Sequence, residues 1–192
     1  MNNREQLVLA IANYEKNKEW IEDIPHEKIE DLAVYVKLRF NCHVTGMEVR
    51  KTLTMQDLAY LQMSKEEALM AAKKNATENA KIERMEDFIA SLKKEALDFS
   101  IPPILVLSSG ETDGAAVIAC PEILQAVHTM IGEDFYILPS SIHEVLIVPK
   151  YICDDAEELK EMVRTVNQAE VMPEERLSDN VYTFDGLRLK LT

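Results

Sequence analysis

Residues 32–40, LAVYVKLRF, constrain the fold most strongly, because their side chains alternate in character along the whole segment. The apolar positions of one set are Leu32, Val34, Val36, Leu38 and Phe40. A period of two predicts a β-strand with one buried face and one wetter face. The next residues, NCHVTG, are typical of a turn, and MEVRKTL at 47–53 predicts a return strand. This part of the chain therefore predicts an antiparallel hairpin.

The same order, a hairpin followed by a helix, recurs at 32–63, 104–131 and 134–167 without any residue match at a fixed period. In the second unit we expect strands at 104–108 and 114–119, joined by a glycine-containing link. Pro121 suits the first turn of the following helix, and Gly132 suits its end.

The third unit places strands in DFYIL and HEVLIV, with a bend at 139–141 and a helix capped by Asp154 or Asp155. An Asp-Gly turn near the C-terminus predicts a final hairpin. Further helices are expected at 4–19, after Thr54, after the Ser64–Glu67 capping box and in the segment that begins at Ile82.

These elements predict an α+β fold, with about six to eight strands in antiparallel hairpins and helices packed on one face. Residues 1–100 would hold an N-terminal helix, a hairpin and a helical segment, and residues 101–192 an α+β half. The two parts could also form one continuous domain.

The chain of 192 residues carries a formal net charge of −13, which disfavours binding to nucleic acid unless basic residues are segregated. Its basic clusters, VRKT at 49–52 and Lys73–Lys74, are too small for that purpose. The acidity is typical of a solvated surface, and a nucleic-acid mimic is the less favoured alternative. No apolar run reaches the ~20 residues of a membrane helix, and the N-terminus lacks a signal-peptide pattern. We therefore expect a cytoplasmic protein that does not bind a membrane.

The segment ILPSSIHEVLIVP at 137–149 contains the most conspicuous candidates for chemistry, namely Ser140, Ser141, His143 and Glu144. A hydrolase or transferase could use a serine with the histidine and the glutamate. Acid–base work or metal binding needs converging side chains, however, and neighbours in a strand point to opposite faces. Serines also supply the local hydrogen bonds of turns. We therefore favour the interpretation as a polar bend over a catalytic or ligand-contacting loop.

Cys120 precedes a predicted helix, whose N-terminus would favour a reactive thiolate, but no base accompanies it in a recognisable pattern. A small buried residue is the favoured interpretation. Three cysteines without a CxxC pair argue against a zinc site or a disulfide framework, although Cys42 and His43 are adjacent. Glycine-rich phosphate loops are absent from the sequence. We therefore predict no metal and no cofactor.

Two segments resemble an uncharacterised bacterial family of unknown function. GEDFYILPSSIHEVLIVP, followed by a helix that ends in VN and by the pattern PEE-LSD-VY, is similar to the C-terminal motif of that family. NYEKNKEWIEDIPHEKIEDLAVYVKLRF is similar to its middle region. The resemblance covers most of the chain and implies a bacterial protein, relatives with an additional upstream segment, and no catalytic role for any residue.

The sequence thus favours a non-catalytic module that binds an unidentified protein partner or has a regulatory role. Its expected functional surface is a cleft near residues 139–144, with Cys120 beside it. The alternative is an unrecognised hydrolase or transferase with a site between Ser140 and Glu144.

Overall fold

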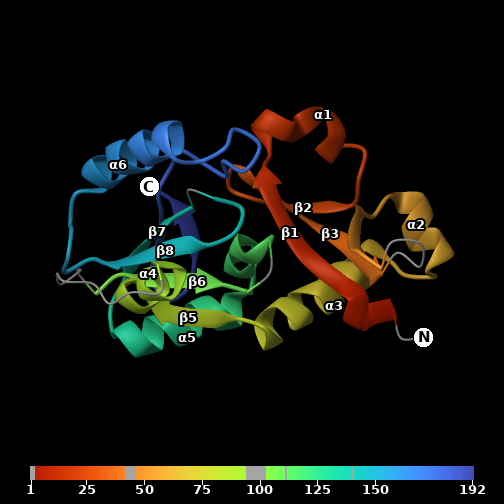
Figure 1. Ribbon diagram of the computed structural model, residues 1–192, viewed down its shortest axis with the longest axis horizontal. Helices are drawn as coiled ribbons and strands as arrows, with labels where there is room; N and C mark the ends of the chain where they lie inside the picture. The colour runs from red at the N-terminus through yellow and green to blue at the C-terminus, as the bar shows by residue number, and fades with distance from the viewer. Residues whose placement is uncertain (1–2, 42–45, 94–102, 111, 140) are drawn as a thin grey trace.

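The computed structural model describes residues 3–41, 46–93, 103–110, 112–139 and 141–192, and these form two antiparallel sheets (Figure 1). The first sheet has the strand order β1-β3-β2, and β4 also pairs with β3. Its strands are β1 (Leu7–Asn13), β2 (His26–Ile29), β3 (Leu32–Asn41) and β4 (Glu48–Thr52). In the register, Ile11 lies opposite Val34, and Phe40 lies opposite Val49.

The second sheet has the order β10-β9-β7-β8-β6-β5, and each of its strands is antiparallel to its neighbours. Its strands are β5 (Lys81–Arg84), β6 (Leu105–Ser108), β7 (Phe135–Leu138), β8 (Val145–Pro149), β9 (Tyr182–Phe184) and β10 (Leu189–Leu191). The predicted α+β class with antiparallel hairpins is confirmed. The chain nevertheless builds two sheets where the sequence suggested one, and three of its strands, β1, β2 and β5, were not predicted as strands.

The helices surround both sheets. The α-helices are α1 (Lys18–Ile21), α2 (Met55–Tyr60), α3 (Lys65–Glu78), α4 (Met85–Lys93), α5 (Pro121–Ile131) and α6 (Ala156–Ala169). The 3-10 helices are η1 (Asn3–Gln6), η2 (Glu15–Asn17) and η3 (Gly114–Ala119). Figure 1 shows α5 and α6 on opposite sides of the second sheet, and α3 passing beside β1. The sequence predicted helices on one face of a sheet. In the second sheet helices cover both faces, because α6 lies on the face opposite α5.

The predicted helix at 4–19 is wrong, because its central residues form strand β1. All seven residues of β1 are buried. Leu7, Leu9 and Ile11 enter the main core, whereas Ala10 and Ala12 pack with Ile21 of α1 on the other face. A strand that is covered on both faces reads as a continuous apolar run, which periodicity alone does not separate from a buried helix.

Two other predicted elements also differ. The expected strand at 114–119 is the buried 3-10 helix η3, whose residues are enclosed from all sides. The expected helix from Ile82 begins only at Met85, since residues 81–84 pair with β6 as strand β5. Residues 114–119 are a short apolar run and residues 81–84 a short, mostly charged segment, and in both tertiary packing decides the local conformation.

The helix boundaries agree well with the sequence. Thr54 and Ser64 each make a capping box, with Asp57 and Glu67 respectively. Asp155 caps α6. α5 begins at Pro121 and ends at Ile131, and its C-cap Gly132 adopts the left-handed conformation that glycine tolerates. These signals are local, so they do not depend on how the sheets pack.

One main core joins the two sheets. It contains Leu9 and Val34 from the first sheet and Phe135 and Ile147 from the second, with η3 packed among them. A second cluster under α6 includes Tyr136, Val148, Leu159 and Val163. The chain changes from the first sheet to the second between β4 and β5, and β5 pairs with β6 across residue 100. The division into 1–100 and 101–192 stays a prediction. Among the described residues, no helix is long and apolar enough to span a membrane.

Candidate functional site

The conspicuous bend connects β7 to β8 and is not itself a strand. Ser141 forms an isolated bridge with Arg176, and β8 begins only at Val145. Strand pleating was the predicted reason for the divergence of the His143 and Glu144 side chains, and this reason is therefore wrong. Their side chains do have different partners, which the local hydrogen bonds determine.

Ser141 organises the bend through its hydroxyl group. The backbone N–H of His143 donates to Ser141 Oγ at 2.9 Å, and Ser141 Oγ donates to Glu144 Oε1 at 3.1 Å. Ser141 is only 6% exposed, so these bonds satisfy a buried polar group. Such side-chain to backbone bonds are typical of turns. Ser140 lies outside the residues that the structure describes.

The imidazole of His143 lies between two acceptors. Its Nδ1 contacts the carbonyl oxygen of Thr112, and its Nε2 lies 3.2 Å from Glu175 Oε1. A neutral imidazole has one N–H group and donates to one of them, whereas the protonated ring donates to both. In the part of the chain that is described, the ring is thus engaged away from the Ser141 hydroxyl. The hydrolase or transferase alternative needs a nucleophile beside its base and stays a prediction.

A buried carboxylate lies in the segment that contacts this bend, because Asp113 stands between Thr112, whose carbonyl oxygen contacts His143, and Gly114. Asp113 is 3% exposed, and its carboxylate lies 2.7 Å from Lys37 Nζ and 3.8 Å from an Arg50 nitrogen. Burial, together with the negative charge of Asp113, raises the pKa of Tyr35. No pattern in the sequence marks this cluster, because its members lie in β3, in β4 and before η3 and share no local motif.

The backbone also packs closely at this point. A Cβ atom added to Gly114 would lie 2.3 Å from the carbonyl oxygen of His143. The N–H of Ala115 donates to the carbonyl oxygen of Ile142 at 3.1 Å. The bend is therefore held against η3 by main-chain contact that only glycine allows at position 114.

A second polar cluster links the two sheets around Asp31, in the turn between β2 and β3. Its carboxylate accepts hydrogen bonds from Ser178 Oγ at 2.8 Å, from Asn180 Nδ2 at 3.0 Å and from the Tyr182 hydroxyl. Burial and the bond to Asp31 raise the pKa of Tyr182. Because one carboxylate accepts from three donors, this cluster is a structural connection between the two sheets. Its members are far apart in the chain, so no local sequence pattern marks it.

Cys120 is fully buried at the N-cap of α5, and its Sγ lies 3.6 Å from the carbonyl oxygen of Lys73. Burial raises the pKa of this thiol, whereas a hydrogen bond with Thr77 acts in the opposite direction. A buried neutral thiol is a poor nucleophile. The geometry favours the interpretation of Cys120 as a core residue, next to the surface positions Pro121 and Glu122.

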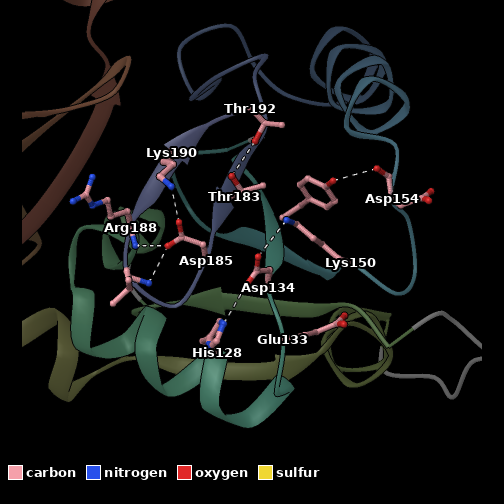
Figure 2. Close-up of polar contacts among 12 residues, drawn as sticks. His128, Glu133, Asp134, Lys150, Asp154, Thr183, Asp185, Arg188, Lys190 and Thr192 are labelled. Carbon is pink, nitrogen blue, oxygen red and sulfur yellow. Dashed lines mark hydrogen bonds and ion pairs between the residues drawn. The ribbon is translucent and has the colours of Figure 1, made fainter.

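Figure 2 shows the polar contacts at the β9–β10 end of the second sheet. Asp134 lies between His128 and Lys150, at 3.4 Å from a nitrogen of each. Asp185 accepts from Lys190 Nζ at 2.6 Å and from the backbone N–H groups of residues 187 and 188, which lowers its pKa. These are paired surface charges and turn contacts, which contribute little net stability and leave no group poised for chemistry.

Two adjoining hollows lie elsewhere, along the outer side of α3. One hollow of about 700 Å³ runs between α3, β2 and the start of α5. A second hollow of about 700 Å³ adjoins it, between α2 and the loop before β2, and both include Lys65 and Glu66 in their walls. We call the two together the α3 groove. Met70 and Met55, one in each hollow, are 67% and 60% exposed.

The charges in the α3 groove are unequal. Its three basic residues are all engaged: Lys73 Nζ lies 2.7 Å from Glu27, Lys74 Nζ lies 3.6 Å from Glu78, and Lys65 Nζ donates to the His26 carbonyl oxygen. The walls also carry Glu22, Asp23, Glu66 and Glu122. Among the described residues, Asp23 and Glu122 have no ion-pair partner. The groove therefore carries a surplus of negative charge.

No sequence motif predicts the α3 groove, because KEEALMAAKKNA is ordinary helical sequence. Glu66, Met70, Lys73 and Thr77 follow helical spacing along the groove side of α3, whereas Ala68, Ala72 and Ala76 are buried in the main core. Met70 is exposed on this side, but Met130 and Met162 are exposed on other helices too, so an exposed helical methionine alone does not mark the groove. Among the described residues, no group of three or more His, Cys, Asp or Glu side chains could hold a metal ion.

Comparisons with known proteins place the chain in a family without assigning it a role. Residues 1–186 match the family of unknown function DUF5688, and the chain therefore belongs to this family. The expected resemblance to an uncharacterised family is confirmed. No curated protein and no solved structure matches the chain.

Proposed function

We propose that this member of DUF5688 is a non-catalytic protein-binding module, and that its partner docks in the α3 groove. The observation that carries the proposal is the pair of adjoining hollows, each of about 700 Å³, with Met55 and Met70 exposed in their walls. Exposed apolar groups rimmed by polar residues are typical of interaction surfaces.

The shape of the α3 groove suits a polypeptide better than a small molecule. Its walls come from three separated stretches of the chain, residues 22–27, 55–78 and 121–122, and it follows α3, whose 14 residues extend over about 20 Å. Small-molecule sites are concave and enclose their ligand, with a few polar groups that converge on it. The lysines of this groove are instead bound to neighbouring groups of the protein itself. Methionine adapts to varied partner surfaces because its side chain is flexible and polarisable.

A photocrosslinking residue at position 70 tests the proposal in the cells that produce the protein. The matched control places the same residue at position 162, because Met162 is also an exposed helical methionine, 52% exposed, but lies on α6. We expect a discrete crosslinked protein from position 70 and not from position 162. Equal products from both positions, or no product from position 70, would overturn the proposal.

A further inference from the structure

We infer that the α3 groove selects a basic amphipathic helix of its partner, an inference that rests on the proposed protein-binding function. Leucine or similar side chains on one face of that helix would contact Met55 and Met70, and lysine or arginine side chains would reach the acidic rim. Docking of an amphipathic helix into a groove is a recurrent mode of recognition, in which anchors repeat at helical spacing.

The negative charge of the groove determines the sign of the charge that a partner must carry. Asp23 stands in the wall of one hollow and Glu122 in the wall of the other, so unpaired negative charge is present in both. Glu66, which both hollows share, adds a third carboxylate in between. The net charge of −13 adds a long-range field of the same sign. Such a field accelerates encounter with a basic partner and disfavours an acidic one.

The apolar part of the groove determines which secondary structure the partner must present. Met70 and Leu69 of α3 and Pro121 at the start of α5 line one hollow together with charged residues, so this hollow offers apolar as well as charged contacts. Met55 and Met63 give the other hollow the same character. A partner must then present apolar groups on one side and charges on the other, and an amphipathic helix does so over several turns. An unstructured basic tail would pair with the acidic residues of the groove and leave the methionines exposed to water.

A synthetic peptide provides the probe. The test peptide has about 18 residues, enough to span α3, with leucine at helical spacing and lysine elsewhere. One comparison peptide replaces each lysine with glutamate, and another has the Leu–Lys composition in an order that destroys the apolar face. Binding of each labelled peptide to the full chain is measured by fluorescence anisotropy at about 50 mM and about 300 mM salt, concentrations that differ strongly in screening.

Two pairs of variants locate the binding. Asp23→Asn with Glu122→Gln removes groove charge, and the matched control, Glu83→Gln with Glu170→Gln, removes the same charge elsewhere. Met55→Ser with Met70→Ser removes the apolar contacts, and Met130→Ser with Met162→Ser is its control. The amphipathic basic peptide should bind best and weaken at high salt. The groove-charge pair should raise its Kd about threefold or more, and the groove-methionine pair about tenfold, whereas the controls should leave it unchanged.

The outcomes separate this inference from the proposed function. If the glutamate peptide binds best and its binding depends on Met55 and Met70, the groove binds protein but the basic partner is excluded. If the scrambled peptide binds as well as the amphipathic one, a helix is not recognised and the inference fails. If no peptide responds to the groove variants, the inference fails as well, and crosslinking at position 70 then decides whether the proposed function stands.

Discussion

The bend at 139–144 and the α3 groove contrast in how they appear in sequence and in structure. The bend has unusual residues, and the described ones are engaged in internal contacts: Ser141 with Glu144, and His143 with Thr112 and Glu175. The groove has ordinary helical sequence, yet it leaves methionines exposed between charges. Unusual residues can therefore mark a backbone that needs particular hydrogen bonds, whereas a binding surface consists of what packing leaves uncovered.

The largest effect is expected from Asp113→Ala, which tests whether the bend rests on a structural ion pair. The change leaves Lys37 and Arg50 without their buried carboxylate, and removal of one partner from such a group is strongly destabilising. We expect the free energy of unfolding to fall by about 3 kcal/mol in denaturant titration.

The Lys37→Ala change serves as its control in a double-mutant cycle. The double variant should lose less stability than the sum of the two single variants, because the two side chains contact each other. Additive losses would contradict the assignment of this pair as the support of the bend.

Gly114→Ala tests the close main-chain contact. The added Cβ would lie 2.3 Å from the His143 carbonyl oxygen, so the bend and η3 must move apart. Overpacking of this kind costs about 2 kcal/mol. Gly132→Ala is the matched control, because its Cβ meets nothing within 4 Å and its positive φ alone costs about 1 kcal/mol. Equal losses in thermal unfolding would mean that the contact at Gly114 is relaxed in solution.

Ser141→Ala removes the hydroxyl that bonds to the His143 amide and to Glu144. We expect a loss of about 1 kcal/mol, because the partly buried N–H of His143 then lacks its acceptor. Ser141→Thr keeps a hydroxyl and should retain more of the stability. Unchanged stability of the alanine variant would favour a role of this serine in chemistry over its role in the bend.

The smallest effect concerns α2, a wall of the α3 groove. The hydrogen bond from Lys51, with those from the backbone and side chain of Thr54, lowers the pKa of Asp57 from 3.8 to about 2. A lowered carboxyl pKa stabilises the folded state above pH 3.8, and this contribution disappears as the pH falls from about 4 to about 2. It amounts to less than about 1 kcal/mol, because Asp57 lies near the surface. Asp57→Asn should flatten the pH profile of unfolding over this interval, and an unchanged profile would contradict this contribution of Asp57.

Local signals in the sequence predicted local structure. The capping residues Thr54, Ser64 and Asp155, the Pro121–Gly132 helix and three hairpins all follow from interactions within a few residues. Failures occurred where burial from several sides removed the periodicity, as in β1 and η3. The charge pair of Lys37 with Asp113 and the cluster around Asp31 depend on contacts between distant segments, for which one sequence contains no signal.

The central claim is that the bend stabilises the fold and the α3 groove binds the partner. The most direct test measures two quantities, the free energy of unfolding and the affinity for the amphipathic Leu–Lys peptide, on Ser141→Ala and Met70→Ser. We predict that Ser141→Ala loses stability and keeps its affinity, and that Met70→Ser loses affinity and changes in stability by less than about 0.5 kcal/mol. The opposite pattern, with binding lost at Ser141 and retained at Met70, would contradict this claim.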